Sequence, residues 1–235
     1  MSINNNQRAP SKEQIDSVIS LYTAGKIDEA INAVQLLNKD YPNVPLLYNL
    51  LGVFYKSLKQ SDTAVRMFNT ALSIKGDYSE AHKNLGITLN DIGKLKESVK
   101  SFEQAIFFDK NNAVLHFYLA NVYHEMGQLE NSISQYKNAI EINPKFSEAF
   151  NNLGNIYKDL GKFPSAAKSY QKALKINQNF AEAFYNLGIV QKKLRLIDDS
   201  IESFISAIKI KPRFAEAHNN LGSSLNALGQ NFDAM

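Results

Sequence analysis

The stretch SEAFNNLGNIYKDLGK, residues 147–162, returns in altered form as AEAFYNLGIVQKKLRL at residues 181–196. The two copies are offset by 34 residues and share their central Asn-Leu-Gly. Steps of the same length find further versions: EAHKNLG at 80–86, YNLLG at 48–52 and EAHNNLG at 216–222. A fixed period of this length indicates an array of repeated structural units, each packed on its neighbours.

Each unit reads as a helix, a turn and a second helix. In residues 147–180, small and apolar residues recur at spacings of three and four in both halves, which predicts two helices with apolar faces. These residues are Ala149, Phe150, Leu153, Gly154, Tyr157 and Leu160, then Ala166, Ala167, Tyr170, Ala173, Leu174 and Ile176. Gly161 supplies a left-handed turn between the halves. Pro164 stands near the start of the second helix, where its missing N–H is tolerated.

Small and large residues alternate between the two helices of a unit. One first-helix position holds Gly52, Gly86, Ala120, Gly154, Gly188 and Gly222. A second-helix position holds Val34, Phe68, Phe102, Tyr136, Tyr170 and Phe204. Because glycine inside a helix costs about 1 kcal/mol relative to alanine, its repeated use predicts close packing of the two helices.

Composition and charge limit the possible classes of function. The 235 residues include 26 basic and 23 acidic ones and no cysteine. A net charge of +3 is too small to indicate nucleic acid or a membrane surface as the main partner. The absence of cysteine excludes disulfides and thiolate metal sites and is compatible with a cytoplasmic location. The polar start MSINNNQRAP is no signal peptide, and PLLYNLLGVFY is too short to span a membrane, so we expect a soluble chain.

The repeat resembles the tetratricopeptide repeat (TPR) family, whose unit has an aromatic residue, Leu-Gly, Tyr, spaced Ala and a closing Pro. It is similar to the repeat region of protein O-linked N-acetylglucosamine transferases and of bacterial TPR-containing transferases. The resemblance implies an all-α fold, a right-handed α-α superhelix (solenoid) of about six and a half helix–turn–helix repeats. We expect a flexible tail at 1–10, followed by units at 11–44, 45–78, 79–112, 113–146, 147–180, 181–214 and, in part, 215–235.

The ends of the array depart from the repeat pattern. Ser11 and Gln14 form a predicted capping box at the start of the first helix. The seventh unit runs through its first helix, passes Gly229 and reaches Met235 where its second helix should begin. We expect the chain to be the N-terminal part of a longer protein; a lone capping helix is the alternative. Lys59 and Arg195 replace the turn glycine in two units, a change that the fold should tolerate.

No group of residues predicts catalysis, a metal site or a cofactor. His82, His116 and His218 occupy the aromatic position of successive units, so we interpret them as packing residues on separate helices. Glutamates recur in the first turn of the first helices, where they favour the helix dipole. These are Glu80, Glu148, Glu182 and Glu216. Such a row lacks the contrasting environments of an acid–base pair, so we expect no enzyme activity in this chain and no small-molecule substrate.

Basic residues gather where two of the first helices end, at Lys158, Lys192, Lys193 and Arg195. Acidic residues are interleaved with them, and base-stacking aromatic residues are not arranged alongside. A solvated charged face explains this pattern, so no nucleic acid partner is expected.

Asparagines form a row along the first helices. In a TPR array these helices line a concave groove, and the resemblance implies that the second, fifth, sixth, ninth and twelfth positions face it. The groove residues expected here are Asn49, Asn84, Phe117, Tyr118, Asn121, Asn151, Asn152, Asn155, Tyr185, Asn186, Asn219 and Asn220. Asparagine is a poor helix former, so its repetition indicates packing or function. An amide can pair with both groups of a peptide bond. Simple copying of Asn-Leu-Gly by duplication is the alternative.

These features predict a protein–protein interaction module that holds an extended polypeptide in its groove, partly through the asparagines. Phe117 and Tyr118 interrupt the row and could form a pocket for an anchoring side chain. One alternative is a substrate-recruiting arm of a longer glycosyltransferase or sulfotransferase. A structural scaffold that assembles a complex through its edges is another.

Overall fold

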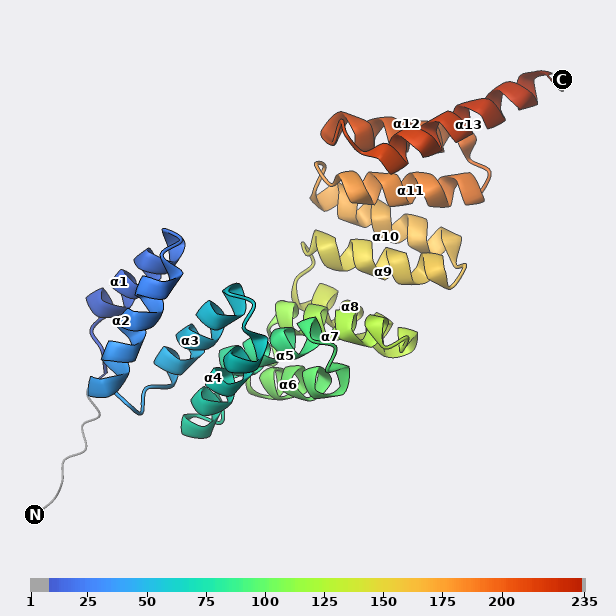
Figure 1. The fold of residues 1–235 in the computed structure, drawn as a ribbon. Coiled ribbons are helices and arrows are strands. Elements are labelled where there is room, and N and C mark those ends of the chain that lie inside the picture. Colours follow the sequence, from blue (N-terminus) through green and yellow to red (C-terminus); the bar gives the residue numbers. More distant parts are fainter. Residues whose placement is uncertain (1–8, 234–235) are drawn as a thin grey trace, which may run out of the picture. The chain divides into compact units, whose positions relative to one another are not determined.

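The computed structural model describes residues 9–233, so the expected tail at 1–10 lies outside it except for its last two residues. Within this range the chain forms thirteen helices and no strand, which confirms the all-α fold (Figure 1). The helices are α1 (Lys12–Thr23), α2 (Ile27–Asp40), α3 (Pro45–Ser57), α4 (Ser61–Ile74), α5 (Ser79–Asp91), α6 (Leu95–Phe108), α7 (Ala113–Glu125), α8 (Leu129–Ile142), α9 (Ser147–Asp159), α10 (Phe163–Ile176), α11 (Ala181–Lys193), α12 (Ile197–Ile210) and α13 (Ala215–Asp233). Each of the six full repeats contributes a first and a second helix.

The chain divides into two compact units, Met1–Val122 and Tyr123–Met235, which are described separately as unit 1 and unit 2. In unit 2, α9 to α13 pack against one another in chain order (Figure 1). In unit 1, α1 to α6 pack in the same consecutive way. Helix pairs joined by short turns therefore supply the packing in both units, as expected for a repeat array.

The core of unit 2 consists of the apolar stripes that the period predicts. Ala166, Tyr170 and Ala173 of α10 meet Leu187 and Val190 of the next first helix, α11. All five side chains are buried. Each second helix is thus covered by its own first helix and by the first helix of the following repeat, so that no repeat buries its apolar faces alone.

The predicted contacts between glycine and aromatic residues are confirmed. Gly52 faces Phe68, Gly86 faces Phe102, Gly154 faces Tyr170 and Gly188 faces Phe204. In each pair, a Cβ at the glycine would run into the ring at 3.0 Å or less. Gly222 of α13 differs, because a Cβ there would meet no atom within 4 Å.

Helix ends follow the sequence signals. The Ser11 hydroxyl accepts a hydrogen bond from the Gln14 backbone N–H at 3.2 Å, and the Ser11 N–H donates to Gln14 Oε1 at 2.8 Å, which confirms the capping box. Gly161 has a φ of 70°, in the left-handed region. Pro164 lies in the first turn of α10. Lys59 and Arg195 adopt the same left-handed turn, with φ of 60° and 64°.

We expect Lys59→Gly and Arg195→Gly each to raise the free energy of unfolding by about 0.5–1 kcal/mol. The left-handed conformation costs a non-glycine residue about 1–2 kcal/mol, and the greater freedom of glycine in the unfolded chain offsets part of that gain. Chemical denaturation followed by circular dichroism measures the change. Lys100→Gly, at an exposed position inside α6, is the control and should destabilise the chain by about 1 kcal/mol. A loss of stability at both turns would contradict the expectation.

The seventh repeat differs from the sequence pattern. Gly229 stands at the repeat position of the turn glycine Gly161, yet α13 continues through it without a break to Asp233. The turn glycines elsewhere are followed by a second helix that packs on the first, and the few residues after Gly229 form no such helix among the described ones. Without that packing, nothing favours a turn over continued helical hydrogen bonding.

Candidate functional site

The expected groove residues lie on the first helices, and they differ in exposure. In unit 1, Asn49 of α3 is buried, whereas Asn84 of α5 is half-buried. In unit 2, Asn151 of α9 is buried and Asn219 of α13 is exposed. The remaining members are half-buried: Phe117, Tyr118, Asn121, Asn152, Asn155, Tyr185, Asn186 and Asn220. The row is therefore accessible in part, and its most enclosed members are the fifth-position amides of Asn49 and Asn151.

Hydrogen bonds join the row from one repeat to the next. In unit 1, Nδ2 of Asn84 donates to Oδ1 of Asn49 at 3.0 Å. In unit 2, Nδ2 of Asn186 donates to Oδ1 of Asn151 at 3.5 Å. The same link recurs at the next junction with the phenol of Tyr185, which accepts from Asn220 at 3.4 Å. In all three cases a sixth-position asparagine donates to the fifth-position residue of the preceding repeat, so part of the row serves the contact between helices.

Other members bond to their own surroundings. Nδ2 of Asn151 donates to Oδ1 of Asn152 at 3.2 Å, and the Tyr170 hydroxyl donates to Oδ1 of Asn155 at 2.8 Å. Burial raises the pKa of Tyr136 to about 12, against the opposing effect of its hydrogen bond with Asn152. Burial, aided by the charge of Asp159, also raises the pKa of the Tyr170 phenol. Asn152 and Asn155 of α9 thus form hydrogen bonds with two buried tyrosines, whose phenols stay protonated at neutral pH.

Three sixth-position asparagines keep hydrogen-bonding capacity. Asn84, Asn186 and Asn220 donate through Nδ2, but no described residue donates to their Oδ1 atoms. The Nδ2 bond restricts the rotation of each amide and leaves its Oδ1 atom as an acceptor without a donor among the described residues. Each of these side chains can therefore offer an oriented acceptor to a backbone N–H of a ligand.

The first helix of the fourth repeat, α7, replaces the amides by apolar groups. Val114, with an exposed fraction of 41%, lies three and four residues before Phe117 and Tyr118, so the three share one face of the helix. Tyr118 stacks on the buried ring of Phe102 with centroids 5.8 Å apart, and Phe117 packs edge-on against Tyr118 at 5.9 Å. This surface of unit 1, here named the α7 patch, suits an apolar side chain rather than a peptide backbone.

Comparison with known families identifies the repeat. The sequence patterns of two repeat families match, and together they cover more than half of the chain. The family described as "TPR repeat" matches at 88–127, 120–161 and 154–194, and the one described as "Tetratricopeptide repeat" matches at 46–78 and 181–214. The chain belongs to the tetratricopeptide repeat family. The likeness of this TPR array to O-linked N-acetylglucosamine transferases stays a prediction, since the matches concern the repeat itself.

Individual relatives share only part of the TPR array or only its fold. The peroxisomal targeting signal receptor of Saccharomyces cerevisiae is 29% identical over 97 residues, which are 39% of this chain and 16% of the relative. The solved structure of PilW, a type IV pilus biogenesis factor, has a TM-score of 0.78 at 19% identity and covers 90% of this chain and all of PilW. YrrB, a TPR protein with an unusual peptide-binding site, has a TM-score of 0.64 at 20% identity, covering 80% of this chain and 96% of YrrB. At these identities the two structures show the TPR fold.

A second set of polar links between neighbouring TPR units was missed by sequence reasoning. The twelfth position of one repeat pairs with the thirteenth of the next. The pairs are Tyr22 with Ser57 at 2.7 Å, Lys56 with Asp91 at 3.0 Å and His124 with Asp159 at 3.5 Å. All three span 35 residues, as the asparagine links do. A search for polar pairs at that spacing would have found both sets.

The histidines at the aromatic position of the TPR units serve structure. The Nε2 atoms of His82 and His218 lie 2.9 Å from the backbone oxygens of Gly76 and Pro212, six residues earlier. His116 makes the equivalent contact at 3.4 Å. Among residues 9–233, no three His, Asp or Glu side chains are placed to hold one metal ion. In the same range no helix is long and apolar enough to cross a lipid bilayer.

Proposed function

We propose that the chain is a protein-interaction scaffold whose first helices bind an extended segment of another protein. The observation that carries this proposal is the orientation of Asn84, Asn186 and Asn220, each held by Nδ2 and each with its Oδ1 atom free of donors from described residues. Acceptors fixed before binding lower the entropic cost of ordering the site. They pair with backbone N–H groups, so the segment is recognised with little regard for its side chains.

Similar proteins support a peptide as the ligand. The yeast relative is named a targeting signal receptor, and YrrB is described as having a peptide-binding site. Arrays of helix pairs commonly bind extended segments along one surface. In unit 1 the α7 patch adds a requirement to this proposal: a segment held by Asn84 places one apolar side chain on Val114, Phe117 and Tyr118, which gives this part of the ligand a preference that amides alone would not supply.

The proposal is tested with peptides selected from a random phage-displayed library on the purified chain. Asn186→Ala combined with Asn220→Ala should weaken the binding of a selected peptide about tenfold, because each lost hydrogen bond contributes about 0.5–1.5 kcal/mol. Fluorescence anisotropy measures the dissociation constant. Circular dichroism should show unchanged helix content, since alanine favours a helix more than asparagine does.

Two asparagines outside the row provide the matched control. Asn69 of α4 and Asn131 of α8 are exposed on second helices, and the double replacement Asn69→Ala with Asn131→Ala should leave peptide affinity unchanged. Equal affinities for the wild-type chain and the Asn186→Ala, Asn220→Ala variant would refute a role of the asparagine row in binding.

A further inference from the structure

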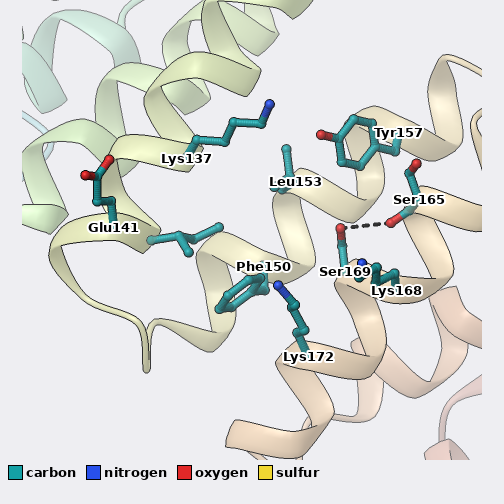
Figure 2. A pocket seen from close by; sticks show the side chains of 10 residues that line it. Lys137, Glu141, Phe150, Leu153, Tyr157, Ser165, Lys168, Ser169 and Lys172 are labelled. Atoms are coloured by element: carbon teal, nitrogen blue, oxygen red, sulfur yellow. Dashed lines mark hydrogen bonds between the residues drawn. The ribbon is translucent and has the colours of Figure 1, made fainter.

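A pocket of about 360 Å³ lies in unit 2 between α8, α9 and α10 (Figure 2). Its apolar floor includes Phe150, Leu153 and Tyr157 of α9. These residues are spaced by three and four and therefore share one face of the helix, whereas Asn151 and Asn155 lie on the opposite face. The pocket is thus separate from the asparagine row and opens on the other side of the same helix.

Lysines surround this floor. Lys137 extends from α8, and Lys168 and Lys172 extend from α10 (Figure 2). All three are exposed, and none forms an ion pair with a described residue. Nζ of Lys172 lies 5.3 Å from the centre of the Phe150 ring, so a cation–π contact holds this charge over the floor. Glu141 is the single acidic residue of the lining, and the pocket carries a net positive charge.

The other repeats show that this charge is not needed for packing. Two repeats earlier, the positions equivalent to the three lysines hold Asn69, Lys100 and Gln104. One repeat later they hold Gln171, Glu202 and Ser206. The apolar partners of the floor persist through the array, with Leu85 and Leu187 at the position of Leu153. Since stacking proceeds at these junctions with one lysine or none at the three positions, the convergence of three lysines at one junction indicates a ligand.

We propose that this pocket is a second binding site, for an acidic peptide segment that carries one large apolar side chain. The apolar side chain packs on the floor formed by Phe150, Leu153 and Tyr157, and carboxylates on either side of it pair with Lys137, Lys168 and Lys172. Pockets of this size bury a single large side chain with its backbone. A nucleic acid fits less well, because stacking needs an exposed ring face, whereas Phe150 is 8% exposed and lies beneath Lys172.

The probe for this site is a fluorescein-labelled Gly-Glu-Glu-Phe-Glu-Glu-Gly peptide, titrated with the 235-residue chain in low salt. Lys168→Glu with Lys172→Glu should raise its dissociation constant tenfold or more, because two attractive charges become repulsive. A peptide with glutamine in place of glutamate should also bind about tenfold more weakly than the probe, and so should one with alanine in place of phenylalanine. Raising NaCl from about 50 to 500 mM should raise the dissociation constant of the glutamate peptide and leave that of the glutamine peptide unchanged.

Two further variants distinguish the pocket from general charge attraction and from the asparagine row. Lys145→Glu with Lys175→Glu makes the same change in net charge at exposed positions of unit 2 outside the pocket, and should alter the dissociation constant less than twofold. Asn186→Ala with Asn220→Ala should retain full binding of the acidic probe. The proposal is overturned if the probe does not bind, if the glutamine peptide binds equally well, or if both lysine double variants weaken binding alike.

Discussion

Gly154→Ala is expected to lower the free energy of unfolding by about 1–3 kcal/mol, the range for forcing an extra methyl group into a packed core. The new Cβ would lie 2.6 Å from Cε1 of Tyr170, closer than two non-bonded carbon atoms approach without a shift of one of them. The ring cannot move aside easily, because Tyr170 is completely buried and its hydroxyl is bonded to Asn155. Urea denaturation followed by far-ultraviolet circular dichroism measures the loss.

Gly222→Ala is the matched control, at the same repeat position of α13. A Cβ there meets nothing within 4 Å, so only the higher helix propensity of alanine acts, and stability should rise by up to about 1 kcal/mol. Opposite signs at Gly154 and Gly222 would show that contact with the aromatic ring, rather than helix propensity, maintains glycine in the repeat. Equal effects at the two positions would refute this explanation.

The second large effect is a fall in the free energy of unfolding at alkaline pH. Burial raises the pKa of Tyr136 from its ordinary value of 10 to about 12, so the folded chain holds this phenolic proton more tightly than the unfolded chain does. The stabilisation is therefore complete below pH 10 and is lost as the pH rises through 12. A difference of about two pKa units corresponds to about 2–3 kcal/mol. The raised pKa of Tyr170 acts in the same direction. Denaturation curves between pH 8 and about 12 measure the loss.

Tyr136→Phe separates this effect from the titration of surface lysines. The variant loses hydrogen bonds with Asn152 and Ser132, so its stability at pH 7 should fall by about 1 kcal/mol. Phenylalanine has no proton to lose, and the decline above pH 10 should therefore be shallower by the contribution of Tyr136. A decline of the same steepness in both proteins would show that other groups cause the alkaline unfolding.

The repeat period predicted those features that recur within one helix pair. It placed Gly154 against Tyr170 and the left-handed turn at Gly161, and the structure confirms both. The capping box at Ser11, predicted from the local pair of Ser11 and Gln14, is confirmed as well. Such contacts depend on residues that are close in sequence and on a packing scheme that every full unit repeats. Gly229 shows that a glycine at the turn position does not by itself interrupt a helix, because α13 continues through it.

The candidate site was harder to predict, because its contacts join different repeats. The sequence indicated which asparagines share a row, but not that Asn186 bonds to Asn151, which depends on how adjacent first helices approach each other. The pocket beside Phe150 was not predicted from the sequence, because its lining also comes from different repeats. Lys137 is supplied by one repeat and Lys172 by the next, and neither stands out in its own helix. The role of the asparagine row in binding remains a prediction.

The hydrogen bond between the sixth position of one repeat and the fifth position of the preceding one affects how repeats can be added to the chain in evolution. The segment 147–180 contains both halves of the link, an acceptor in Asn151 and a donor at Asn152, the position that Asn186 fills in the next unit. A tandem duplication of this segment would place the donor of each copy beside the acceptor of the copy before it. Every added copy would bring its own inter-repeat bond and its own glycine–tyrosine contact. The gene could therefore be lengthened by unequal recombination in steps of 34 codons, without compensating substitutions at the new junctions.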